Sequence, residues 1–235
     1  MTAGTIFEGT RKPLSLWFRV IWLVTSQKQG ISALGLQRAL GFKRYETAWV
    51  WLHKLRRAMV RPGRGRLSGT VEVDETYVGG HEEGVRGRET ATKSIVVIAA
   101  EARGRAIGRI RLRPVPNVTA RSLLAFVRES IEPESLIQTD GWRGYAPLAR
   151  EGYRHEAIRI ERSGRLAHEL LPRVHRVAAL LKRWWLGTHQ GAIQPHHLDY
   201  YLDEFTFRFN RRTSRQRGKL FYRLLQQALQ IEWAP

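Results

Sequence analysis

The sequence predicts an α/β fold: a mixed β-sheet flanked by helices and preceded by a small helical unit. Apolar residues follow helical spacing over residues 14–60, and the period changes to two between residues 71 and 113. Helical and strand patterns then alternate. A chain of 235 residues is also long enough for one sizeable core and a small accessory unit.

The N-terminal region predicts helices. Residues 14–27, "LSLWFRVIWLVTSQ", are apolar at nearly every helical position, so we expect this helix to be buried. The segments "ISALGLQRAL" and "YETAWVWLHKLRRAM" follow, separated by a Gly-Phe break. This order is typical of a helix-turn-helix that binds DNA, and also of a helical hairpin packed on a core. In the first case, Arg56 and Arg57 at the end of the second helix are the candidate DNA contacts.

The Pro-, Gly- and Arg-rich stretch 61–69 predicts a linker and a domain boundary. After it, the pattern predicts three strands, a helix and a fourth strand, at 71–78, 94–101, 105–113, 119–131 and 135–140. We therefore divide the chain into three predicted domains. They are a helical, helix-turn-helix-like DNA-binding region at 1–66, an α/β domain at 67–212 and a basic helical tail at 213–235.

The chain carries 40 Lys and Arg against 21 Asp and Glu, a formal charge of +19. Such an excess predicts a polyanionic partner, either nucleic acid or an anionic membrane surface. Both ends are especially basic, because almost all charged residues in 1–66 and 206–235 are Lys or Arg. The sequence has no apolar run long enough to span a bilayer, no signal-peptide pattern and no Cys for disulfides or thiolate zinc sites. We therefore expect a soluble intracellular protein that binds DNA or RNA and no membrane.

Two acids lie side by side in "VEVDETYVGG", residues 71–80. Successive residues of a strand point to opposite faces, so only one of Asp74 and Glu75 can belong to a given site. A third acid, Asp140, ends the apolar strand of "SLIQTDGWRGY", where it could form a turn or hold a ligand. Two acids that end neighbouring strands favour the ligand interpretation, because carboxylates brought together need a cation to offset their charge.

The segment "VHRVAALLKRWWLGTHQG", residues 174–191, has helical spacing. Its predicted buried stripe consists of Val177, Leu180, Leu181 and Trp184. His175 and Lys182 fall on the opposite face, two turns and roughly 10 Å apart. On their own, both are as consistent with a solvated helix face as with a functional site.

Four segments occur in order between about residue 69 and residue 212: "GTVEVDETYVGG", "IQTDGWRGY", "VHRVAALLKRWWLGTHQG" and "HLDYYLDEFTFRFNRR". Asp74 and Asp140 are 66 residues apart, Asp140 and His175 are 35 apart, and His175 and Lys182 are 7 apart. In motifs and spacing, the chain resembles the DDE-superfamily transposases of bacterial insertion sequences, in particular the ISXO2-like family. The segments "TAGTIF" and "LHKLRRAM" resemble the upstream region of that family.

The resemblance implies an RNase-H-like, DDE-type catalytic domain in which Asp74 and Asp140 hold Mg²⁺ or Mn²⁺, with two ions expected. It implies that His175 is the third ligand and that Lys182 is a further catalytic residue. Many members of the superfamily have Glu at the third position. An imidazole is a poorer ligand than a carboxylate for Mg²⁺ and suits Mn²⁺ better. The alternative third acids are Glu169, Asp203 and Glu204.

The implied activity is that of a DNA transposase, which cleaves phosphodiester bonds with the help of metal ions and transfers strands at insertion-sequence ends. The implied partners are double-stranded DNA, as terminal repeats and target, and further copies of the chain on that DNA. The implied location is the bacterial cytoplasm, in association with the nucleoid. The predicted DNA contacts are Arg56, Arg57, Arg183, Arg208, Arg211 and Arg212. The aromatic stripe of Tyr201, Phe205 and Phe209 is predicted to be core rather than a base-stacking platform.

Two alternatives stay open. One is a catalytically inactive remnant that binds DNA through its helix-turn-helix and basic ends. The other is a host-serving RNase-H-like nuclease that cuts branched DNA or RNA–DNA hybrids. Similar proteins begin with a cysteine-rich zinc ribbon ahead of the segment that resembles "TAGTIF", whereas this sequence starts at that segment. We expect cleavage to survive the loss of such a module better than end-specific transposition does.

Overall fold

The computed structural model describes residues 2–61, 63–79, 93–158, 167–191 and 193–231. The chain divides into two compact units, which we call the helical unit (residues 1–64, 187–190 and 203–235) and the sheet unit (residues 65–186 and 191–202). The first break between them falls inside the stretch 61–69. The three domains predicted from the sequence stay a prediction.

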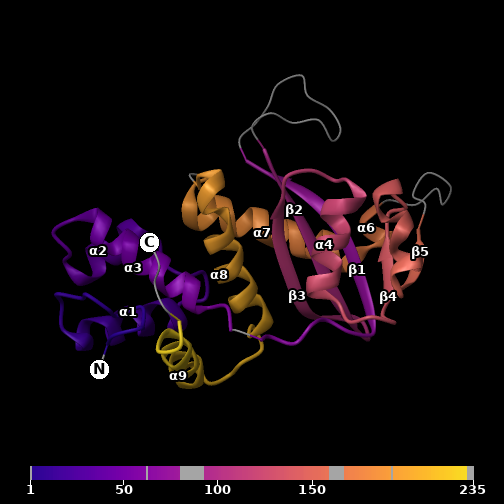
Figure 1. Cartoon of the computed structure of the whole chain (residues 1–235). Helices are drawn as coiled ribbons and strands as arrows, with labels where there is room; N and C mark the ends of the chain where they lie inside the picture. Colours follow the sequence, from indigo (N-terminus) through magenta and orange to yellow (C-terminus); the bar gives the residue numbers. More distant parts are fainter. Residues whose placement is uncertain (1, 62, 80–92, 159–166, 192, 232–235) are drawn as a thin grey trace. The chain divides into compact units, whose positions relative to one another are not determined.

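Within the described residues, the sheet unit contains a five-stranded mixed sheet with the order β3-β2-β1-β4-β5 (Figure 1). The strands are β1 (Thr70–Val78), β2 (Ser94–Arg103), β3 (Ala106–Val115), β4 (Leu136–Thr139) and β5 (Arg154–Ala157). Strand β2 pairs antiparallel with β1 and β3, whereas β4 pairs parallel with β1 and β5. The predicted α/β class is confirmed, and the arrangement is compatible with an RNase-H-like fold.

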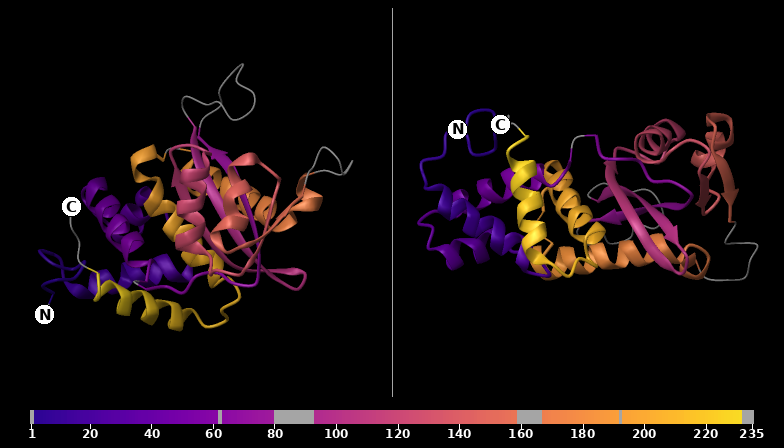
Figure 2. Two further views of the ribbon diagram at one scale, coloured as in Figure 1. Left: turned by 45° about the vertical axis from the view of Figure 1, so that its right-hand side comes forward. Right: turned by 90° about the horizontal axis from the view of Figure 1, so that it is seen from below.

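Helices cover both faces of the sheet, as the view from below in Figure 2 shows. Side chains alternate along β1, so Val71 and Val73 share one core with Phe126 of α4 (Ala120–Ser130). The intervening Glu72 contacts the start of α7 (Pro172–His189) on the other face. Further helical segments are η1 (Arg143–Glu151), α6 (Ala167–Leu170), η2 (Pro195–His197) and α8 (Leu198–Asn210).

The helical unit is built on α1 (Leu14–Ser26), α2 (Ala33–Leu40), α3 (Tyr45–Ala58) and α9 (Arg217–Ala228). Trp17 stacks on Trp51 with ring centroids 3.7 Å apart and an interplanar angle of 10°, which joins α1 to α3. Gly41 ends α2 with φ 66°, a left-handed conformation that glycine adopts without strain. The helix-turn-helix-like order of α2 and α3 therefore has a defined turn.

The predicted burial of α1 on all sides is wrong. Its buried residues follow helical spacing on one face and include Val20 and Val24, whereas Phe18 and Trp22 are 41% and 48% exposed. These two side chains line an open apolar groove together with Phe221 of α9. Apolar composition alone predicted burial, but the neighbouring helices cover only one side of α1.

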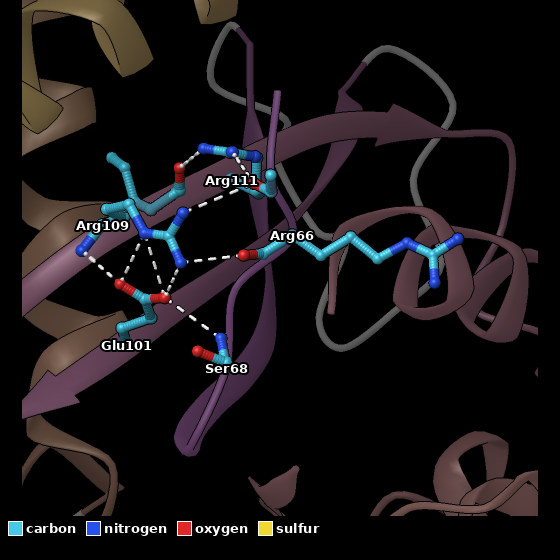
Figure 3. Close-up of polar contacts among 7 residues, drawn as sticks. Arg66, Ser68, Glu101, Arg109 and Arg111 are labelled. Atoms are coloured by element: carbon cyan, nitrogen blue, oxygen red, sulfur yellow. Dashed lines mark hydrogen bonds and ion pairs between the residues drawn. The ribbon is translucent and has the colours of Figure 1, made fainter. Parts of the chain in front are cut away.

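A network of hydrogen bonds fixes the segment before β1 to the β2–β3 hairpin (Figure 3). The guanidinium of Arg109 donates to the Arg66 carbonyl at 2.8 Å and to the Glu101 carboxylate. Arg111 donates to the Gly65 carbonyl at 2.7 Å, and the Ser68 N–H donates to Glu101 at 3.1 Å. Burial alone would raise the pKa of Glu101, but these hydrogen bonds outweigh it and lower the pKa below its usual value. The network holds the start of β1 in its register.

The predicted elements match β1 to β4 and α4 within one or two residues, whereas β5 and η1 were not predicted. The predicted aromatic core stripe is confirmed, since Tyr201, Phe205 and Phe209 are all buried. In α7, Val177, Leu181 and Trp184 are buried as predicted, but Leu180 is only half-buried. Among the described residues, no helix combines the length and apolarity needed to cross a membrane.

Candidate functional site

The strand register brings the two predicted metal-binding acids to the same level of the sheet. Strands β1 and β4 pair in parallel, with Thr70 opposite Leu136 and Glu72 opposite Gln138. This pairing offset equals the spacing between Asp74 and Asp140, so continuing the register by two residues places the two acids opposite each other. Neighbouring strands lie roughly 5 Å apart, and residues opposite each other point to the same face. Continued in this way, the register would put both carboxylates on the face of the sheet that carries Glu72.

Tyr145 gives independent support for this clustering of acids. Its side chain is fully buried, and its hydroxyl donates a hydrogen bond of 3.2 Å to Glu75 Oε2. Burial raises the pKa of Tyr145 well above its usual value, and the negative charges of Glu75, Asp74 and Asp140 raise it further. All three carboxylates are therefore close enough to act on one phenol.

Asp74 and Glu75 point to opposite faces, as the strand alternation predicts. Glu75 lies on the face of η1, where it accepts the hydrogen bond from Tyr145, while Asp74 approaches α7. Asp74 Oδ1 also accepts the N–H of Glu75 at 2.8 Å. Since Glu75 contributes negative charge from behind the strand, it adds to the field of the site without sharing the face of Asp74.

The turn after β4 orients Asp140. Its Oδ1 accepts the N–H of Trp142 at 2.9 Å, and Gly141 has φ 80°, which favours glycine. Thr139 accepts the Gly141 N–H at 3.3 Å and pairs with His155 Nε2 at 2.9 Å. Asp140 is thus a turn-former, as one interpretation of the sequence proposed, and the turn fixes its carboxylate at the strand end.

His175 lies beside Asp74, with Nε2 3.6 Å from Asp74 Oδ2. The start of α7 is held at this place by Glu72, which is 1% exposed. Glu72 Oε2 accepts the backbone N–H groups of Arg173 and Val174 at 2.7 and 3.0 Å, and Oε1 pairs with the Arg173 guanidinium at 2.6 Å. A carboxylate at a helix N-terminus satisfies unpaired N–H groups and interacts favourably with the helix dipole. Glu72 therefore places His175 next to Asp74.

The chemical types of the candidate donor atoms, carboxylate oxygen and imidazole nitrogen, suit a hard divalent cation. Carboxylate oxygens are the ligands that Mg²⁺ and Mn²⁺ prefer, and an imidazole is acceptable to Mn²⁺. The acids that act on Tyr145 concentrate negative charge that a cation would offset. Across the part of the chain that the structure describes, no group of three or more His, Cys, Asp or Glu side chains has converged into a metal-binding arrangement. The candidate ligands are thus two acids at the same level of the continued strand register, Asp74 and Asp140, and the neighbouring His175.

Lys182 is exposed on α7, two turns beyond His175. Partial burial of its stem lowers the pKa of Lys182 from its usual value, and the charge of Lys93 lowers it further. Lys93, which directly precedes β2, was not predicted as part of this region. Two ammonium groups close enough to influence each other form a local site of attraction for phosphate.

The alternative third acids have different surroundings. Glu169 is exposed on α6 of the sheet unit. Asp203 and Glu204 belong to the helical unit. Glu204 is 2% exposed and pairs with Arg56 and Arg208, both at 2.8 Å. Burial alone would raise the pKa of Glu204, but the charges of Arg208 and Arg56 outweigh it and lower the pKa to about 2. Glu204 is thus held as the centre of a buried ion cluster.

This cluster changes the interpretation of two predicted DNA contacts. Arg56 is 2% exposed and its Nε donates to Glu204. Arg208 is 14% exposed and also donates to the carbonyls of Val24 and Gln27. A buried, paired guanidinium has no surface to offer a phosphate. Arg56 and Arg208 therefore stabilise the helical unit through these contacts.

The other predicted DNA contacts are more accessible. Arg57, Arg183 and Arg212 are exposed. Arg211 is half-buried, with its guanidinium 4.1 Å from the centroid of the Phe207 ring. Burial lowers the pKa of Arg211 to about 10, and the charges of Arg223 and Arg61 contribute. Arg57, Arg183 and Arg212 are thus accessible to solvent, although Arg212 also donates to the Phe209 carbonyl at 2.9 Å.

Sequence reasoning missed two residues that shape the site, Glu72 and Tyr145. A signal for Glu72 existed, since it shares a strand face with Asp74 and lies between the apolar residues Val71 and Val73. An acid at such a position must find partners, and α7 supplies them. Tyr145 gave no such signal, because its part in the site depends on the fold of η1 against β1.

The chain is similar in sequence to known transposase proteins. A family model described as "ISXO2-like transposase domain" matches residues 66–210, which is more than half of the chain. The chain is also similar to an "uncharacterized transposase-like protein" of Haemophilus influenzae. The two are 30% identical over 101 residues, which cover 41% of this chain and 76% of that protein. The matched family segment includes β1, β4 and α7, the elements that carry the site.

Proposed function

The chain belongs to the ISXO2-like transposase family, and from this membership we propose that it is an active DNA transposase. Its sheet unit would catalyse metal-dependent phosphodiester cleavage and strand transfer at insertion-sequence ends. One observation supports the proposal most strongly: the spacing of Asp74 and Asp140 equals the pairing offset of β1 and β4, so that continuing this pairing would put both acids at one level on one face. The proximity of His175 Nε2 to Asp74, at 3.6 Å, adds a third donor from α7.

Asp74 and Asp140 would hold the divalent cations through their carboxylate oxygens, with His175 as the third ligand. When bound there, Mg²⁺ or Mn²⁺ would offset the charge on the attacking and leaving oxygens of a phosphodiester. In cleavage, a water oxygen bonds to phosphorus and the bond from phosphorus to the 3′ oxygen breaks. The products are a 3′ hydroxyl and a 5′ phosphate. In strand transfer, that hydroxyl attacks a target phosphodiester and displaces its 3′ oxygen.

The chain's own residues orient this chemistry. Glu72 holds the start of α7 and so fixes His175, while the turn after β4 fixes Asp140. A rigid support of this kind reduces the entropic cost of aligning the reacting atoms. Tyr145, whose raised pKa keeps its proton on the phenol, donates to Glu75 and stabilises the negative charge behind β1.

Exposed positive side chains of both units would bind DNA. The family membership implies DNA as partner, and we assign phosphate contacts to Lys182, Arg183, Arg57 and Arg212 on the basis of their exposure. Phosphate contacts of this kind give affinity that falls with salt and carry little sequence information. Assembly of several copies on the DNA stays a prediction.

The test is nicking of supercoiled plasmid DNA in the presence of Mg²⁺ or Mn²⁺. We expect the parent chain to produce nicked circles. Asp74→Asn and Asp140→Asn should each slow this reaction by a factor on the order of 100 or more, because each removes a charge that holds the cation. Asp199→Asn, at an exposed position on α8, is the matched control and should nick at the parent rate.

Two outcomes would contradict the proposal. If Asp74→Asn and Asp140→Asn nick as fast as the parent, the catalytic acids are assigned to the wrong residues. If the parent binds DNA but no divalent ion supports nicking, the chain is a DNA-binding remnant without catalysis. Preference for branched DNA or RNA–DNA hybrids over plasmids would instead favour a host-serving nuclease.

A further inference from the structure

A basic cavity of about 700 Å³ lies on the sheet unit next to the candidate site. Three of its seven lining residues are arginines and none is acidic: Arg105, Ile107, Pro172, Arg173, His175, Arg176 and Ala179. Those from α7 include Pro172, Arg176 and Ala179, which are spaced four and three residues apart and share one helix face. The cavity therefore extends along α7 on one side of His175.

The arginines of this cavity are not equivalent. Arg173 is committed to the structure, because it pairs with Glu72 and donates to the Gly104 carbonyl at 2.7 Å. Arg105, in the turn between β2 and β3, and Arg176 on α7 are exposed. Within the described ranges, neither of these two side chains takes part in a hydrogen bond or ion pair. A pair of uncommitted guanidinium groups in a concave surface matches the geometry and charge of a phosphate.

His175 belongs both to the cavity and to the candidate metal site. Its side chain lines the cavity, and its Nε2 is 3.6 Å from Asp74 Oδ2. A DNA strand whose reacting phosphate lies at Asp74 and Asp140 would pass His175, and the next phosphates along the backbone would follow α7. Arg105 and Arg176 line the same cavity as His175.

We propose that Arg105 and Arg176 form a binding pocket for a backbone phosphate of the DNA strand, on the His175 side of the phosphodiester that reacts. The inference rests on the proposed function, because it takes the reacting phosphate to lie at the two acids. The ligand is a DNA backbone phosphate. Contact is electrostatic and independent of base sequence.

The test is DNA binding without metal, measured by fluorescence anisotropy on a duplex of arbitrary sequence over a range of salt concentrations. In Arg105→Ala/Arg176→Ala, the slope of log K against log salt should become less steep by about 0.9, because the pair binds one phosphate and each lost phosphate contact contributes about 0.9. Arg121→Ala, exposed on α4, is the matched control. Arg105→Lys/Arg176→Lys should restore most of the slope, because an ammonium keeps the charge.

The outcomes separate this inference from the proposed function. If the double alanine variant keeps the slope of Arg121→Ala while Asp74→Asn still abolishes nicking, the pocket is wrong and the transposase proposal stands. If the slope falls as expected but the parent chain never nicks DNA, the phosphate contact is supported and the catalytic proposal fails. A slope that the double lysine variant does not restore would show that the alanine variant acts through structure, which also overturns the inference.

Discussion

At the scale of residues, three acids within four positions of β1 have three different partners. Glu72 binds the start of α7, Asp74 faces His175, and Glu75 accepts the hydroxyl of Tyr145. Alternation along the strand explains why Glu72 and Asp74 share a face while Glu75 does not. The sequence could predict this alternation, but it could not predict which residues would meet each acid.

We expect Glu72→Gln to weaken both the fold and the proposed catalysis. The amide keeps the size of the side chain but loses the charge that pairs with Arg173 and accepts two helix N–H groups. The free energy of unfolding should fall by about 2 to 3 kcal/mol, a typical value for hydrogen bonds to a charged group. Urea unfolding measures this change, and the plasmid assay should show slower nicking.

The control for this prediction is Glu129→Gln, which removes the carboxylate of an exposed pair with Arg113. An exposed pair contributes at most about 1 kcal/mol. Equal stability losses in Glu72→Gln and Glu129→Gln would show that Glu72 does not hold α7 in the way described.

His175→Glu should change the metal preference of the reaction. A carboxylate suits Mg²⁺, whereas an imidazole suits softer ions such as Mn²⁺. We therefore expect the ratio of nicking rates in Mg²⁺ and Mn²⁺ to move toward Mg²⁺ in His175→Glu by roughly tenfold, the lower range for changes at metal sites. An unchanged ratio would place His175 outside the metal site.

At the scale of elements, the register of β1 against β4 and the position of α7 determine the candidate site. The sequence predicted β1, β2, β3 and β4 because their apolar residues alternate or form buried runs. It did not predict β5, whose four residues "RHEA" are polar or small and mostly exposed, so that no hydrophobic pattern marks the strand. The pairing offset of β1 and β4 equals the spacing of Asp74 and Asp140 in the sequence. Only the register of the sheet shows this equality.

The position of Arg56 in α3 explains why the sequence predicted a DNA contact there. Its position at the end of α3, next to exposed Arg57, is typical of a basic helix terminus. The structure instead buries Arg56 against Glu204, a residue 148 positions away. Pairing over such a distance leaves no local signal in the sequence, so charge alone could not distinguish a structural arginine from a binding one.

The buried cluster around Glu204 predicts acid sensitivity of the helical unit. Burial lowers the pKa of His189 to about 4, so the folded state keeps this histidine neutral where the unfolded chain is protonated. The unfolded state then binds more protons, and stability should fall as pH drops from about 6.5 toward 4. Glu204, with its pKa lowered to about 2, contributes stability above about 4.5 that is lost as pH falls toward 2.

Hydrogen exchange of the α1 and α3 amides at a series of pH values measures this sensitivity in the helical unit itself. We expect His189→Gln to remove the loss of protection between about pH 6.5 and 4. The control is His196→Gln, at an exposed position on η2, which should keep the loss. A parent chain whose protection stays constant across this range would contradict the role of His189.

At the scale of the whole molecule, the chain combines a strongly basic composition with a small acidic site. The formal charge of +19 attracts a polyanion, whereas the negative charges of Glu75, Asp74 and Asp140 all raise the pKa of Tyr145. The four ordered motifs identified the family correctly. They also contain both acids, Asp74 within β1 and Asp140 directly after β4. The supports of the site, Glu72 and the turn after β4, depend on contacts that only the fold provides.

In the proposed mechanism, Asp74 and Asp140 hold the catalytic cation, with His175 as the third ligand. A crystal structure of the chain soaked with Mn²⁺, with anomalous scattering to locate the ion, tests it most directly. We predict an anomalous peak between the two carboxylates, within about 2.0 to 2.3 Å of their oxygens, and ligation by His175 Nε2. An ion bound at Glu169 or Glu204 instead, or a soaked crystal with no peak at the two acids, would contradict the claim.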